Sequence, residues 1–84
     1  MKANETNKVM YLIAMINGNK ESYVENENDV EAGGFVDIDV DNFAFATEQE
    51  AQERIAELEE FSRSKGYILG EHFGFRIEEM PVLF

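Results

Sequence analysis

The sequence contains no cysteine and no tryptophan, and it has a single proline and a single histidine. The lack of cysteine excludes disulfide bonds and thiolate metal sites, and it fits a reducing compartment. Because His72 is the only imidazole and no serine has the context of an activated nucleophile, a catalytic triad is not expected. Basic residues are few, seven against eighteen acidic ones, and they form no patch that would bind nucleic acid. We therefore expect a non-enzymatic protein that needs no cofactor.

Long hydrophobic runs are also absent. The apolar run at residues 9–16 spans eight residues, whereas a helix that crosses a bilayer needs about 20. The polar sequence Asn17-Gly18-Asn19-Lys20 follows this run in place of a small-residue cleavage site, so a secretory signal is not expected. We expect a cytoplasmic protein with a single domain over residues 1–84 and a flexible N-terminus at residues 1–8.

What the sequence has in excess is negative charge. Residues 21–60 hold fourteen of the eighteen acidic residues and one base, Arg54, which gives this stretch a formal charge of −13. Such a field speeds association with a basic surface and repels nucleic acid and anionic membranes. With 44% hydrophobic residues, including seven Phe, the chain is nevertheless too apolar for a disordered acidic tail. We expect a folded acidic domain whose partner carries a basic surface.

The first half of the chain predicts strands. Residues 9–16 predict a strand that ends at Asn17-Gly18, a dipeptide typical of a type I′ hairpin turn, and residues 20–25 predict its return strand. Residues 26–34 are polar and end in a glycine pair, which indicates a long mobile loop. Strict alternation over residues 35–41 predicts a third strand, with its aliphatic residues toward the core and its three Asp toward water. The aliphatic residues are Val36, Ile38 and Val40.

The second half predicts one helix and two further strands. Thr47 and Glu50 have the spacing of a capping box, and Gly66 suits the residue that follows a helix. Residues 67–69 and 73–77 predict two short strands or one broken strand, and the apolar tail at residues 81–84 is expected to pack on the sheet. The predicted fold is α+β, an antiparallel sheet of four to five strands with one helix packed across it, in the order β-β-β-α-β-β.

Two rows of carboxylates indicate a binding surface. Carboxylates two apart on a strand repeat every ~6.6 Å, and those four apart on a helix repeat every ~6 Å. Each strand of duplex DNA places a phosphate every ~3.4 Å, so both rows present charge on the scale that a DNA-binding groove accepts. The surface therefore has the charge spacing of a nucleic-acid mimic. The predicted partner-binding residues are Glu25, Glu27, Asp29, Glu31, Asp37, Asp39, Asp41, Glu50, Glu53, Glu57 and Glu60.

The alternatives are a metal-binding module and a small assembly protein. Asp37, Asp39, Asp41 and Glu48 occupy the first, third, fifth and twelfth positions of a loop with the spacing of a calcium-binding EF-hand. Asn42 stands where that loop requires glycine, so calcium binding remains the alternative. The third interpretation is a structural protein that forms a homodimer through the tail at residues 81–84 or through a bare sheet edge.

A short hairpin, an acidic strand and a helix that opens with Phe45-Ala46-Thr47-Glu48-Gln49-Glu50-Ala51 make the chain similar to the small acidic proteins that phages encode against host defence. The resemblance covers most of the chain and depends on size, charge and element order. It implies an anti-CRISPR or anti-restriction inhibitor that acts in the host cytoplasm and binds a basic, nucleic-acid-binding host protein. It assigns no role to an individual residue.

Overall fold

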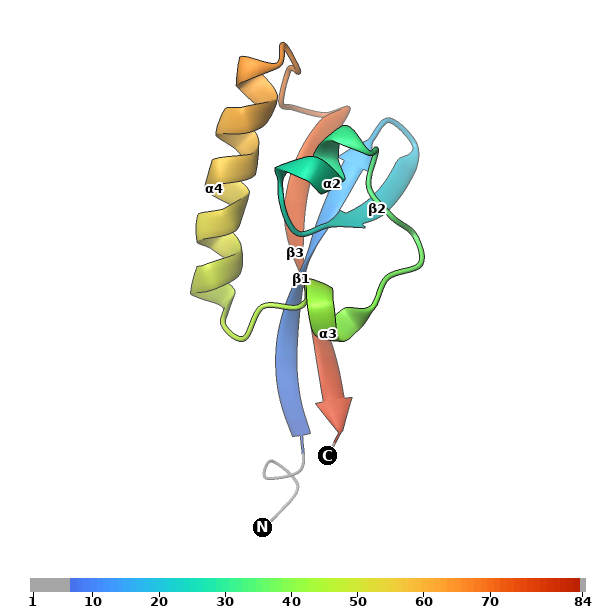
Figure 1. Cartoon of the computed structure of the whole chain (residues 1–84), viewed down its shortest axis with the longest axis vertical. Helices are drawn as coiled ribbons and strands as arrows, with labels where there is room; N and C mark the ends of the chain where they lie inside the picture. Colours follow the sequence, from blue (N-terminus) through green and yellow to red (C-terminus); the bar gives the residue numbers. More distant parts are fainter. Residues whose placement is uncertain (1–6, 84) are drawn as a thin grey trace.

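The computed structural model describes residues 7–83, and within this range the fold is α+β (Figure 1). A three-stranded antiparallel sheet is formed by β1 (Asn7–Asn17), β2 (Lys20–Val24) and β3 (Phe73–Leu83), in the order β2-β1-β3. The helices are α2 (Glu27–Glu31), α3 (Val40–Phe43) and the long α4 (Glu48–Ser64). The α+β class and the single main helix are confirmed. The predicted four to five strands and their order are not.

The first hairpin is confirmed, but its turn lies one residue later than predicted. Asn17 pairs with Lys20, so the two-residue loop is Gly18-Asn19. Gly18 has a φ of 65°, whereas Asn19 has no positive φ, which is the pattern of a type II′ turn. The predicted type I′ turn is therefore wrong, because type I′ requires a positive φ at both loop residues and Asn19 has none.

The main core lies between α4 and one face of the sheet. Ile13, at the centre of β1, pairs with Val24 of β2 and with Ile77 of β3, so the three side chains share this face. From α4, Ala51 and Leu58 are fully buried against it, as the helical spacing of the sequence indicates. The buried cluster consists of Ile13, Met15, Val24, Val30, Ala51, Leu58 and Phe73.

The opposite face of β1 carries Leu12 and Ala14, which are also buried. Tyr23 of β2 lies beside Ala14, and its hydroxyl donates to Glu78 Oε1 of β3 at 2.9 Å. Because β1 runs between β2 and β3, the Tyr23 side chain must cross over β1 to reach Glu78. A tyrosine from one edge strand therefore helps to cover the central strand on its second face.

Charged side chains extend this cover. Arg76 Nη2 lies 2.9 Å from Glu78 Oε2 on the same strand, and it also pairs with Glu21 of β2. Glu21 and Arg76 come from the two edge strands, so this contact spans β1 as the Tyr23 contact does. This network does not follow from the sequence, because its members lie up to 57 positions apart and are joined by the strand register alone.

The contact with Glu78 raises the pKa of the Tyr23 phenol above its ordinary value. The hydrogen bond to the carboxylate is the main cause, and burial and the charge of Glu78 act in the same direction. The folded chain therefore keeps this proton at a pH at which the unfolded chain has released it. Its contribution to stability is complete below about pH 10, and it is lost as the pH rises through the raised pKa.

A titration of tyrosinate absorbance should therefore show one phenol that ionises later than a free tyrosine. Tyr23→Phe should remove that late step, and it should flatten the fall in stability on the alkaline side of pH 10. Tyr67→Phe, which changes an exposed ring, is the matched control and should retain both features. A late step that survives in Tyr23→Phe would show that the Glu78 contact does not hold the proton.

Residues 26–34, predicted as a mobile loop, contain α2. Asp29 N–H donates to the side-chain oxygen of Asn26 at 3.2 Å, and Asn26 N–H donates to the Asp29 carboxylate at 3.1 Å. These two bonds form a capping box, and Val30, the residue after Asp29, joins the core at 4% exposure. Asn and Asp occur in turns as well as in helix caps, so a polar composition does not reveal the helix.

Residues 35–41 do not form the predicted strand, because α3 begins within them. Asp39 is the N-cap of α3, and its carboxylate accepts from Asp41 N–H at 3.1 Å and from Asn42 Nδ2 at 2.8 Å. Such local bonds give the backbone an alternative to pairing in a sheet. The alternation of apolar and acidic residues does not reveal that these side-chain bonds compete with strand pairing.

The aliphatic residues of this segment show the consequence. Phe35 makes one isolated bridge with Tyr23 at the edge of β2, and the chain then bends away. Val36 is 73% exposed, so its predicted core position is wrong, and Ile38 and Val40 are half-buried.

Strand β3 is continuous where two short strands and a separate tail are predicted. Residues 73–77 are confirmed as strand, but residues 67–69 form none, and Tyr67 instead stacks on Phe73 with 4.9 Å between ring centroids. Pro81 lies within β3 opposite Val9, where an edge strand tolerates a residue without an N–H. Residues 1–6 and Phe84 lie outside the described residues, and residues 7–8, predicted to be flexible, begin β1.

Candidate acidic interface

The outer side of α4 presents four of the predicted partner-binding residues together. Thr47 and Glu50 form the predicted capping box, with Glu50 N–H donating to Thr47 Oγ1 at 3.1 Å. From this fixed start, the helix period places four exposed glutamates at steps of three or four residues along one side, over about 15 Å. We call them the acidic stripe: Glu50, Glu53, Glu57 and Glu60.

A shallow hollow lies along the acidic stripe. Its lining comprises Glu50, Glu53 and Glu57 of the stripe together with Arg54 and Phe45. Arg54 Nε lies 3.4 Å from Glu57 Oε1, so one cation stands among three carboxylates and the hollow keeps a negative charge. Phe45 gives it an apolar wall, because its backbone pairs with Tyr11 and holds the ring against the core.

The basic residues around α4 are paired with carboxylates. Arg63 Nη1 lies 3.4 Å from Glu60 Oε1, and Lys65 Nζ lies 3.9 Å from Glu31 Oε1 of α2. Exposed pairs of this kind contribute about 0 to 1 kcal/mol each. They reduce the negative potential around the acidic stripe, but they are too weak to fix the position of its side chains.

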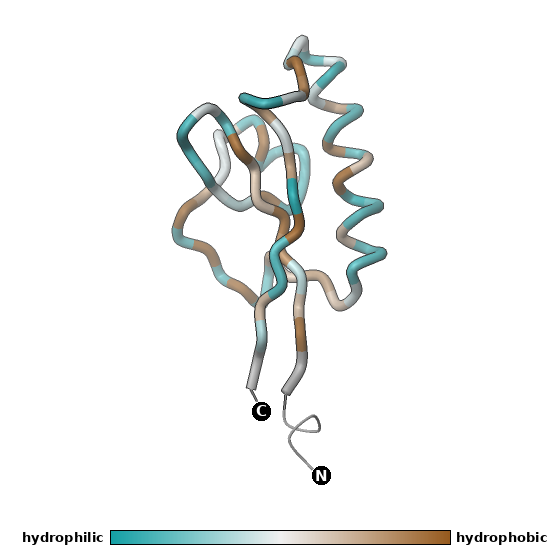
Figure 2. Tube along the Cα trace, turned by 180° about the vertical axis from the view of Figure 1, so that it is seen from behind, coloured by the Kyte–Doolittle hydropathy of each residue, from teal (hydrophilic) through white to brown (hydrophobic). Residues whose placement is uncertain are grey.

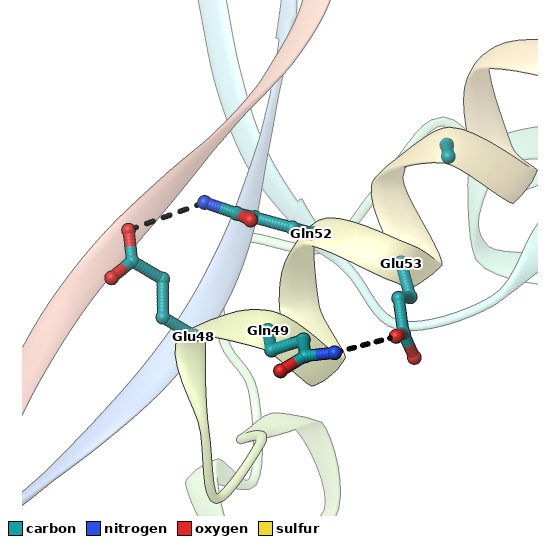
Figure 3. Close-up of a pocket in the computed structure, with 5 residues that line it drawn as sticks. Glu48, Gln49, Gln52 and Glu53 are labelled. Atoms are coloured by element: carbon teal, nitrogen blue, oxygen red, sulfur yellow. Dashed lines mark hydrogen bonds between the residues drawn. The ribbon is translucent and has the colours of Figure 1, made fainter.

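The other flank of α4 has a different character (Figure 3). Glu48, Gln49, Gln52, Glu53 and Ala56 line a shallow hollow there, in which Gln52 Nε2 donates to Glu48 Oε2 at 3.4 Å and Gln49 Nε2 donates to Glu53 Oε2 at 3.2 Å. Figure 3 shows the two carboxylates pointing away from each other, each beside its own amide. This flank therefore does not direct its charges toward a common point.

Of the predicted carboxylates on α2, the structure brings Glu31 to α4. Helix α2 packs against α4, and the Glu31 to Lys65 pair joins its last residue to the end of α4. Asp29, in contrast, uses its carboxylate to accept from the N–H groups of Glu25 and Asn26, so it serves the fold. Glu25 accepts from Asn26 Nδ2, and Glu27 lies in the first turn of α2.

The structure does not join Asp37, Asp39 and Asp41 to the acidic stripe. All three are exposed, but no hydrogen bond or ion pair among residues 7–83 links them to it. Their predicted repeat of about 6.6 Å requires a strand, and this segment has none. This half of the predicted charge spacing is therefore wrong, whereas the helical half is present in α4.

The same residues are not gathered as a metal site. Within the described part of the chain, no group of three or more His, Asp or Glu side chains is placed to hold an ion. Asp39 uses both carboxylate oxygens at the start of α3, and Glu48 lies in the first turn of α4, where it accepts from Gln52.

Comparisons with known proteins do not assign the chain to a family. No family model, no curated protein and no solved structure matches it. Among residues 7–83, the structure has no helix with both the length and the apolar character of a membrane span. A functional conclusion therefore depends on the charge and geometry of the acidic stripe.

Proposed function

We propose that the protein is a non-enzymatic inhibitor that binds a basic, nucleic-acid-binding surface of a host protein through the acidic stripe. The observation that carries this proposal is the presence of four exposed glutamates along one side of a single helix. Like charges at this spacing destabilise a helix by about 0.2 to 0.5 kcal/mol per pair. None of the four packs in the core, and Glu50 alone among them caps the helix, so core packing does not explain the row.

The chemistry of the partner follows from the charge. A surface lined by Lys and Arg at the spacing of phosphates is the complement of a row of carboxylates about 6 Å apart. Encounter would be steered by charge, so association would be fast and would weaken steeply as salt screens interactions beyond about 8 to 10 Å. An anti-CRISPR or anti-restriction inhibitor is the class of protein that acts in this way, with the acidic surface in place of nucleic acid.

Matched variants test whether the position of the charge matters. The stripe variant carries Glu53→Gln, Glu57→Gln and Glu60→Gln, and the control variant carries Glu48→Gln, Glu71→Gln and Glu79→Gln. All six residues are exposed, and both variants raise the net charge from −11 to −8. We expect the stripe variant to lose at least about tenfold in affinity for a partner captured from host lysate, about 1.4 kcal/mol. The control should lose less than half of that free energy.

Stability separates loss of binding from loss of fold. The stripe variant should unfold at about the same temperature, because the repulsion removed between helical neighbours offsets the loss of the Arg54–Glu57 and Arg63–Glu60 pairs. If both variants lose affinity equally, net charge and not the acidic stripe determines binding. If the stripe variant binds as the unmodified chain does, the proposed function is wrong.

A further inference from the structure

Strand β3 is an edge of the sheet along its whole length. Among the described strands it pairs with β1 alone, and the two continue beyond the end of β2 as a two-stranded ribbon (Figure 1). Seen from behind, β3 can be followed from the C-terminus to the loop before it, with α4 to one side (Figure 2). A strand edge of this kind is a template for pairing with another strand.

The hydrogen bonds show which residues of β3 face outward. In an antiparallel ladder, pairs that bond to each other alternate with pairs whose N–H and C=O groups point away. Gly18 N–H donates to the His72 carbonyl at 2.6 Å, so that pair is of the bonded kind. The N–H and C=O groups of Tyr11 both bond to Phe45, so neither group bonds to Glu79, the residue opposite Tyr11 on β3. Both observations indicate that the backbone N–H and C=O groups of the odd-numbered residues of β3 point away from β1.

The outward groups form a run that ends at Pro81. At its start, the Phe73 carbonyl accepts from Gly70 N–H at 2.9 Å, the one backbone bond between described residues on this edge. Pro81 has no N–H to offer. Between these limits, the N–H and C=O groups of Phe75, Ile77 and Glu79 point outward and can pair with another strand.

We propose that two copies of the chain pair through this edge, with their β3 strands antiparallel and Ile77 opposite the partner's Ile77. In this register the outward groups of Phe75 meet those of the partner's Glu79, and those of Glu79 meet the partner's Phe75. A twofold axis through the Ile77 pair relates the copies, so the contact uses the free run of each and closes the assembly. The result is one continuous sheet of six strands.

The charged residues of β3 favour this strand register over the registers shifted by one step in either direction. Arg76 comes to lie directly opposite the partner's Glu78, and Glu78 opposite the partner's Arg76, an arrangement that stabilises paired strands. Moving the axis by one residue along β3 would place two Arg76 or two Glu78 side chains opposite each other, which destabilises the pair. Arg76 already lies 2.9 Å from Glu78 of its own strand, so the dimer would join two such pairs into one network.

This contact is separate from the acidic stripe. Phe45 pairs with Tyr11 at the edge of β1 opposite β3, and it lines the hollow that contains Glu50, Glu53 and Glu57. The start of the acidic stripe therefore lies beside the edge of β1 that is opposite β3, and no residue of the stripe belongs to the free run of β3. Because each copy has a net charge of −11, salt should strengthen dimerisation by screening repulsion between copies. Salt should weaken binding by the acidic stripe, so either proposal can fail alone.

Sedimentation with the full-length chain tests the dimer, using Glu79→Pro and the matched control Glu79→Gln. Proline at this position removes an outward N–H and leaves the bonds to β1 in place. We expect the unmodified chain and Glu79→Gln to dimerise at millimolar concentration and high salt. Glu79→Pro should raise the dimer dissociation constant by about tenfold or more, since two bonds per dimer are lost.

Amide hydrogen exchange in the unmodified chain gives a second readout that requires no variant. On dilution from dimer to monomer, the N–H groups of Phe75, Ile77 and Glu79 should lose protection, whereas those of Arg76 and Glu78, which bond to β1, should not. A chain that remains monomeric at millimolar concentration and high salt overturns the proposal. So does a dimer in which these three amides exchange freely, or one that a folded Glu79→Pro variant forms equally well.

Discussion

Gly34→Ala is expected to lower the free energy of unfolding by about 2 to 5 kcal/mol. Gly34 has a φ of 77°, and a Cβ built there would overlap Ser22 Oγ and lie 2.7 Å from Ser22 Cβ. Ser22 is 2% exposed on β2, and its hydroxyl donates to the Gly33 carbonyl at 3.3 Å, so it has little room to move. The left-handed backbone contributes about 1 to 2 kcal/mol of the loss and the overlap about 1 to 3 kcal/mol.

Gly33→Ala is the matched control for this substitution. Gly33 has a φ of 89°, but a Cβ there meets nothing within 4 Å. It should therefore lose only the backbone contribution, about 1 to 2 kcal/mol. Denaturant unfolding of both variants gives the difference. Equal losses would mean that the junction between α2 and β2 is not packed as closely as the structure shows.

Leu58→Ala is expected to lower the free energy of unfolding by about 2 to 5 kcal/mol, because it leaves a cavity in the middle of the core. Leu58 is fully buried between α4 and the sheet. A domain of 84 residues has a total stability of roughly 4 to 13 kcal/mol, so this loss would be a substantial fraction of the total. Thermal or denaturant unfolding measures it.

Ile68→Ala removes a comparable side chain from the surface. Ile68 is 86% exposed, so its truncation should change the free energy of unfolding by no more than about 0.5 kcal/mol. A Leu58→Ala variant that is as stable as Ile68→Ala would contradict the packing of α4 on the sheet.

Helix α4 could be predicted from the sequence because its determinants are local. The Thr47 and Glu50 capping box, the buried spacing of Ala51 and Leu58, and Gly66 with a φ of 93° after the helix all lie where the sequence indicates. A helix satisfies its backbone within itself, so these short-range signals are sufficient. The acidic stripe was predictable for the same reason.

A strand needs a partner, and this is why residues 35–41 could not be predicted from their alternation. Phe35 reaches the edge of β2, but Asp39 then caps α3 and takes the backbone out of the sheet. The same limit applies to residues 73–83, whose continuous pairing with β1 is decided by the register across the sheet and not by their own pattern. As a result, one row of the candidate interface followed from the sequence and the other did not.

The network of Glu21, Tyr23, Arg76 and Glu78 shows what sequence reasoning omits. Each residue alone is an ordinary member of an alternating strand, and its role becomes visible only when β2 and β3 flank β1. Pairing across strands creates such sites, and a single sequence does not give the register.

Competition between this protein and duplex DNA for the partner captured from host lysate tests whether the acidic stripe occupies a nucleic-acid site. We predict that excess DNA releases the bound acidic protein from its partner. The stripe variant binds the partner weakly from the start, so the amount of it that DNA releases should fall to the background level. A partner that binds the protein equally tightly while its nucleic-acid site is filled would show that the protein does not compete with nucleic acid.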